Sequence, residues 1–179
     1  MKKILLLMLL PVLLWSCGGD NEPTPPVVEV AKNLMTKYPN YESNNEARGE
    51  MIKEINEYGN SFVGKQPPFE GIAFHFKRII TNEQTGAQSA LLESFGALAT
   101  VDNPNVKGRY LAGSVQICVL GIVPNDVALS LDRNVDYRVS GIVHAYDEDN
   151  HFLTTDWNIS LYFGTYIIDD MVLEPITKE

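Results

Sequence analysis

Regular alternation of apolar and polar residues in the second half of the chain constrains its fold most strongly. From Phe69 onward, apolar residues recur at every second position, which is the period of a half-buried β-strand rather than that of a helix, about 3.6 residues. The alternation is clearest in residues 72–76, 115–119, 135–143 and 159–163. Residues 90–101 are apolar with less regular alternation, as expected of a strand buried on both faces. Five strands are therefore predicted.

The segments between these strands have the composition of turns. Residues 81–86, 102–105, 124–126 and 147–150 are rich in Asn, Asp, Gly or Pro, which favour tight changes of chain direction. Asp169-Asp170 is interpreted as a further turn before the last strand. Short strands at such spacing predict a mainly β fold, either a small barrel or a sandwich.

Two helices are predicted before the strands. Residues 28–38 carry apolar side chains at helical spacing and stop at Pro39. Residues 43–46, Ser-Asn-Asn-Glu, have the spacing of a capping box with Ser43 as the cap, and Gly59 offers a C-terminal stop. The second half of the chain is thus preceded by a helical segment.

The first 16 residues predict a signal peptide. Lys2 and Lys3 precede an apolar stretch at residues 4–16, which is shorter than the about 20 residues that span a bilayer. The following Leu14-Trp15-Ser16-Cys17 resembles the lipobox of bacterial lipoproteins. That resemblance implies cleavage before Cys17, attachment of lipid to its sulfur, and anchoring of the chain by acyl groups. An ordinary secreted protein is the alternative.

The predicted division of the chain follows from this leader. Residues 1–16 are the signal peptide, residues 17–42 are the lipidated Cys17 with a Gly- and Pro-rich tether and the first short helix, and residues 43–179 are the packed domain. Gly18, not Asp, follows Cys17, and by resemblance to known lipoproteins this favours the outer membrane.

The charge of the chain argues against nucleic acid as a partner. The chain has 14 basic and 23 acidic residues, and loss of Lys2 and Lys3 with the leader leaves 12 against 23, a net charge of −11. Such a surface repels phosphate backbones.

Without Cys17, Cys118 is the remaining thiol, and its apolar surroundings at residues 115–120 predict a buried core residue, not a nucleophile.

Glycine and aromatic placements carry a resemblance to a fold family. Phe62-Val63-Gly64-Lys65 and residues 69–74 follow the second predicted helix, and residues 137–141, Tyr-Arg-Val-Ser-Gly, lie in a later strand. Over residues 43–176 the chain resembles OB-fold lipoproteins of the tRNA-anticodon-binding-like type. This implies a five-stranded OB-like barrel preceded by one or two short helices, with an immunoglobulin-type β-sandwich as the alternative. It does not imply nucleic-acid binding.

Two clusters of residues could carry chemistry. The first is Phe74-His75-Phe76-Lys77-Arg78, with Arg109-Tyr110 as a neighbour, which could hold single-stranded nucleic acid. Phe74 and Phe76 share a face with Ile72, so core packing is the favoured interpretation. The second cluster combines carboxylates and histidines that could bind a divalent cation: His144, Asp147, Glu148, Asp149, His151 and Asp156. An exposed hairpin turn is favoured there, so no metal site is assigned.

The OB resemblance also predicts where a ligand would bind. OB domains bind at the face of strands two and three, between the loops that join strands one to two and four to five. Those loops would be residues 81–88 and 147–156. His151, Phe152 and Trp157 are the candidate ligand-binding residues, facing a basic peptide or a sugar. The alternative is that Phe152 and Trp157 cap the core.

The expected function is non-catalytic. The sequence contains no G-x-S-x-G, no H-E-x-x-H and no glycine-rich phosphate loop, and no cofactor is predicted. We expect an envelope lipoprotein, held at the membrane by its lipid, that binds a protein, peptide or glycan or stabilises an assembly. The alternative is a cation-binding or hydrolytic envelope enzyme that uses residues 144–156.

Overall fold

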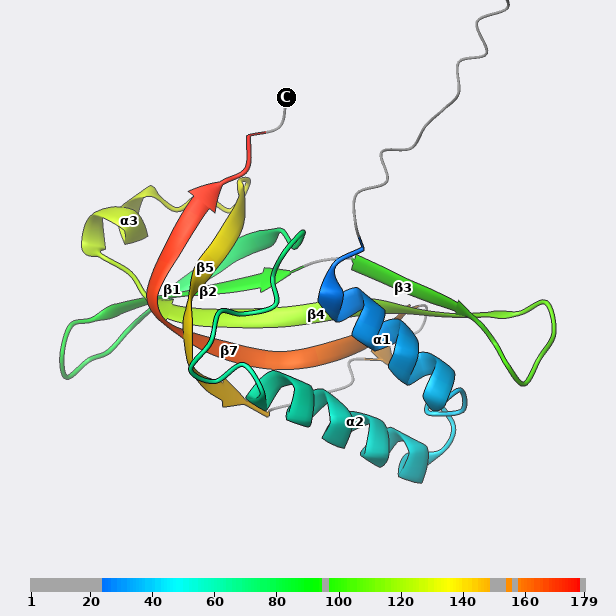
Figure 1. Cartoon of the computed structure of the whole chain (residues 1–179). Helices are drawn as coiled ribbons and strands as arrows, with labels where there is room; N and C mark the ends of the chain where they lie inside the picture. Colours follow the sequence, from blue (N-terminus) through cyan, green and yellow to red (C-terminus); the bar gives the residue numbers. More distant parts are fainter. Residues whose placement is uncertain (1–23, 95–96, 149–153, 156–157, 178–179) are drawn as a thin grey trace, which may run out of the picture.

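The computed structural model describes residues 24–94, 97–148, 154–155 and 158–177. These residues form a mainly β structure preceded by two helices (Figure 1). The helices are α1 (Pro26–Lys37), α2 (Asn45–Asn60) and α3 (Asn125–Ser130). The strands are β1 (Phe74–Thr81), β2 (Gln88–Ser94), β3 (Ala97–Asp102), β4 (Tyr110–Ile122), β5 (Asp136–Asp147), β6 (Thr154–Thr155) and β7 (Asn158–Pro175).

Five of these strands form a partially closed ring. Strand β1 pairs with β2, β2 with β4, and β5 with β7, all antiparallel, while β4 pairs with β7 in parallel. The ring closes between β1 and β5 through only two residue pairs, Phe74 with Tyr137 and His75 with Asp136. Five strands in a partly open barrel are the OB-like arrangement predicted from the sequence, and that fold class is confirmed.

The irregular apolar segment 90–101 contributes two strands along one edge of β4. Strand β2 pairs with the end of β4, and β3 pairs with its beginning, from Ala97 opposite Val115 to Asp102 opposite Tyr110. The β3–β4 hairpin therefore extends past the ring, and α1 lies against it (Figure 1). A long β4 thus joins the barrel to a helix-covered extension.

Helix α1 belongs to the same hydrophobic core as the strands. Its buried side chains are Val27, Val28, Ala31, Leu34 and Met35. The sequence placed the start of the packed domain at residue 43. Helix α1 packs against β3 and β4, and Ala99 and Leu111 of the β3–β4 hairpin lie in the same core as its buried side chains. The packed unit therefore includes α1.

Helix α2 starts and ends differently from the prediction. Asn44, not Ser43, is the N-cap, and its side-chain oxygen accepts hydrogen bonds from the amides of Glu46 and Ala47. The Ser43 hydroxyl instead donates to the carbonyl of Asn40. Gly59 does not stop the helix, which runs to Asn60. It is buried against the ring of Tyr146, so its small size serves packing.

Two predicted turns are parts of longer elements. Residues 124–126 contain the start of α3, with Pro124 as its N-cap residue. Asp169 and Asp170 lie inside β7, which continues to Pro175. Asp170 has a φ of 48°, and the pairing with β5 shifts nearby, from Ser140 opposite Val172 to Ile142 opposite Asp169. Ladder pairing continues on both sides of this irregularity, so the chain bends without leaving the sheet.

None of the helices in the described part of the chain is both long and apolar enough to cross a membrane.

Candidate functional site

The predicted lipid attachment residue and the predicted ligand-binding residues lie outside the described residues. These are Cys17 at the anchor, and His151, Phe152 and Trp157 in the connection between β5 and β7. Of the predicted cation cluster, Asp149 and Asp156 also lie outside.

The described members of the cation cluster have separate partners. The Nδ1 atom of His144 lies 3.0 Å from Oδ2 of Asp169 on β7. Glu148 instead faces α2, and its Oε1 accepts a hydrogen bond of 2.8 Å from Nδ2 of Asn60. Within the described residues, no three His, Cys, Asp or Glu side chains are grouped closely enough to hold a metal ion.

The aromatic and basic cluster on β1 is divided between the core and the surface. Phe74 is fully buried, which confirms its core role, and Phe76 is half-buried. Nδ1 of His75 lies 2.6 Å from Oδ1 of Asp136, and Nζ of Lys77 lies 2.9 Å from Oε2 of Glu93. Arg109 and Tyr110 are at the far end of the β3–β4 hairpin, whereas β1 adjoins β2 and β5. The cluster is therefore not continuous with them.

Cys118 is buried, as predicted. Burial raises the pKa of its thiol, and the hydrogen bond with the Tyr162 hydroxyl opposes that rise only in part. A thiol with a raised pKa is protonated at neutral pH, which makes it a poor nucleophile. Cys118 sits in the row Glu93–Cys118–Thr165 across β2, β4 and β7, on the outward side of the barrel.

The same outward side carries a continuous group of aliphatic side chains. Leu91, Leu120 and Ile167 are opposite one another across β2, β4 and β7. Ile80 and Ile122 flank Ser89 in the next row, and they are 39% and 61% exposed. We call these five residues, Ile80, Leu91, Leu120, Ile122 and Ile167, the outer apolar face. Directly paired residues project from the same side of a sheet, so the five side chains share one surface.

The inner neighbours of these residues show that the outer apolar face is not core. Ala90, Leu92 and Val119 are fully buried, and they alternate with Leu91 and Leu120 along the same strands. Strands β2 and β4 are thus apolar on both sides at this end of the barrel. On a soluble domain, a clustered apolar surface marks an interaction site more often than scattered apolar residues do.

An ordered polar loop borders the outer apolar face. Residues 82–87 join β1 to β2 directly beyond the pair Thr81–Gln88, next to Ile80 and Ser89. The Asn82 side-chain oxygen accepts hydrogen bonds from the amides of Gln84 and Thr85, at 2.9 and 3.1 Å, which fixes the shape of the loop. This is the loop between strands one and two that the OB resemblance placed beside a ligand.

The sequence of β4 contains a pattern that indicates this surface, although it was not part of the prediction. In β4, the outward positions are polar or small at Ser114, Gln116 and Cys118, and they become apolar at Leu120 and Ile122. Loss of alternation at one end of a strand indicates burial on both faces or a binding surface. Only the pairing with β2 and β7 shows that Leu91 and Ile167 continue the same face.

No family model matches this chain, and neither the curated proteins nor the solved structures contain a match to it.

Proposed function

We propose that this chain is an envelope lipoprotein whose barrel binds a segment of another envelope protein on the outer apolar face. The lipid on Cys17 would hold the barrel at the membrane, and the Gly- and Pro-rich residues after it would act as a tether. The role is non-catalytic: the domain positions a partner near the membrane and changes no bond in it.

The observation that carries this proposal is the presence of Leu91, Leu120 and Ile167 in one row on the outside of the ring. Aliphatic side chains at these positions do nothing for the barrel interior, which is filled from the opposite side by residues such as Leu92 and Val119. Their burial by a partner would be favourable by about 25 cal/mol for each Å² removed from water.

The chemistry of the surface favours a protein segment over a sugar or a nucleic acid. The outer apolar face consists of Ile and Leu residues, whereas sugars and bases bind best to flat aromatic rings. With Lys2 and Lys3 removed, the chain has a net charge of −11, which steers basic partners toward it and repels phosphates. An apolar segment flanked by basic residues fits both properties.

A charge introduced into the outer apolar face is expected to abolish partner binding without unfolding the barrel. Ile122→Glu places a carboxylate at a position that is 61% exposed, so its cost to the free protein is small, within about 0.5 kcal/mol. Chemical cross-linking in intact envelopes, followed by mass spectrometry, identifies the wild-type partner. That partner is then purified and its affinity measured for each variant.

The matched control is Leu129→Glu on α3, where the side chain is 87% exposed and lies outside the outer apolar face. We expect this variant to bind the partner as wild type does, and Ile122→Glu to bind it at least about tenfold more weakly. Equal binding by all three proteins would contradict the proposed surface while leaving the lipid anchor unaffected.

The anchor has its own test. Wild-type protein is expected in the membrane fraction, and Cys17→Ser in the soluble fraction, because acyl chains supply the membrane affinity. Cys118→Ala is the control, since its buried thiol is not a lipid attachment site, and it should fractionate as wild type does. Membrane association of Cys17→Ser at the wild-type level would exclude the lipoprotein assignment.

A further inference from the structure

A shallow hollow lies at the seam between β1 and β5, where the ring is only partially closed. Beyond His75, β1 runs on to Thr81, but its neighbour β5 begins only at Asp136, opposite His75. The connection between α3 and β5 passes this seam, and the hollow, of about 550 Å³, is lined by His75, Phe76, Lys77 and Arg133. The hollow is shallow and open to solvent, so a ligand in it would stay partly exposed.

Basic side chains line the hollow, and the carboxylates that pair with two of them do not. Asp136 holds Nδ1 of His75 at 2.6 Å, and Glu93 holds Nζ of Lys77 at 2.9 Å. Neither carboxylate is among the lining residues. These contacts fix the His75 ring and the Lys77 ammonium in place at its wall. Asp136 and Glu93 balance the charge of these two basic groups, so Arg133 is the lining residue whose positive charge has no such partner among the described residues.

Arg133 completes the lining from the other side of the seam. The amide of the adjacent Asp132 donates a 2.9 Å hydrogen bond to the Tyr137 hydroxyl, which ties the connection to β5. The Arg133 side chain makes no hydrogen bond or ion pair with another described residue. The exposed Arg133 guanidinium therefore has N–H donors available for an acceptor from a ligand. It lies beside the Lys77 ammonium and the half-buried Phe76 ring.

We propose that this hollow binds a small carboxylate whose body is flat and apolar. The guanidinium of Arg133 would hold both carboxylate oxygens through two parallel N–H···O hydrogen bonds, the geometry in which Arg and carboxylates match best. The ring of Phe76 would pack against the apolar body, and Lys77, which is paired with Glu93, lines the wall beside it. This site is separate from the outer apolar face and does not depend on the function proposed for that face.

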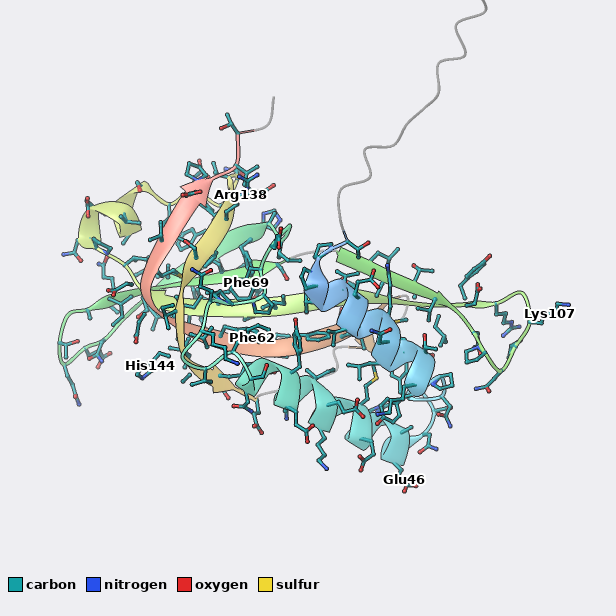
Figure 2. The ribbon with its side chains drawn as sticks, in the orientation of Figure 1. Glu46, Phe62, Phe69, Lys107, Arg138 and His144 are labelled. Atoms are coloured by element: carbon teal, nitrogen blue, oxygen red, sulfur yellow. The ribbon has the colours of Figure 1, made fainter. Side chains whose placement is uncertain are left out.

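The test uses full-length protein and 4-fluorobenzoate, whose binding is followed by ¹⁹F NMR. Wild type should broaden and shift the fluorine signal, and Arg133→Gln should weaken binding at least about tenfold. The uncharged isostere 4-fluorobenzamide should not bind. Lys107→Gln is the control, because Lys107 lies at the distant tip of the β3–β4 hairpin (Figure 2) and its loss should leave binding unchanged.

Each other outcome counts against the proposal. Absence of fluorobenzoate binding, or equal binding by wild type and Arg133→Gln, would overturn it. A weakening by Lys107→Gln as large as that by Arg133→Gln would show attraction by overall charge rather than a site. Inorganic phosphate is the competing probe, and displacement of fluorobenzoate by phosphate at equal concentration would show an oxyanion site with no preference for carboxylates, which contradicts the proposed ligand class.

Discussion

A chain that starts at residue 43 is expected to lose its cooperative unfolding transition. Removing α1 takes away four large side chains that are at most 4% exposed, Val27, Val28, Leu34 and Met35. Full burial of each contributes about 1.5–3 kcal/mol, and together they approach the whole stability of a small domain, about 5–15 kcal/mol. The apolar residues of the β3–β4 hairpin under α1 would also become exposed to water.

Thermal unfolding followed by near-ultraviolet circular dichroism measures this effect. A chain that starts at residue 24 retains α1 and is the matched control, and it should unfold in one sharp transition. The chain from residue 43 should show no such transition, and it should bind a hydrophobic dye such as ANS. Similar melting curves for the two chains would mean that α1 is an accessory to the barrel rather than part of its core.

Replacing the two glycines of α2 by alanine, one at a time, is expected to change the stability of the protein in opposite directions. Gly49 is exposed, and apart from its neighbours in the helix no atom lies within 4 Å of where a Cβ would be, so Gly49→Ala should stabilise the protein by about 0.4–1 kcal/mol. Gly59 faces the ring of Tyr146, and an added Cβ would overlap its carbon atoms. Despite the better helix propensity of alanine, Gly59→Ala should destabilise the protein by about 1–3 kcal/mol.

The cause of the Gly59 effect can be checked with a second substitution. Tyr146 packs between Gly59 on α2 and Gly164 on β7, and its hydroxyl donates a hydrogen bond to the carbonyl of Phe163. Replacing this ring by leucine costs stability alone, but it removes the atoms that the methyl group added at position 59 would overlap. Urea unfolding of Gly59→Ala, Tyr146→Leu and the double variant should give a double-variant cost clearly below the sum. Additive costs would rule out steric overlap as the cause.

The sequence by itself predicted the features that depend on neighbouring residues. Apolar alternation from Phe69 onward indicated the strands, and the five predicted strands correspond to β1, to β2 with β3, and to β4, β5 and β7. Residues 28–38 and 43–59 were recognised as helical for the same reason, since spacing along one element determines which face is apolar. Errors occurred where two local solutions have similar energies, as with Ser43 and Asn44 as caps.

Features that depend on residues far apart in the chain required the tertiary structure. Alternation shows that Leu91 and Leu120 lie on strands, but only strand order and register bring them into one row with Ile167. Arg133 has no distinguishing sequence context, and it lines the same hollow as His75 and Lys77 because β5 pairs with β1 over just two residues. Gly59 is a plausible helix stop until Tyr146 is seen beside it. The local pattern of apolar residues determines the period of each element, whereas tertiary packing determines which faces meet. The outer apolar face is a sheet face with no packing partner among the described residues, and the hollow lies where the edges of β1 and β5 are only partly paired.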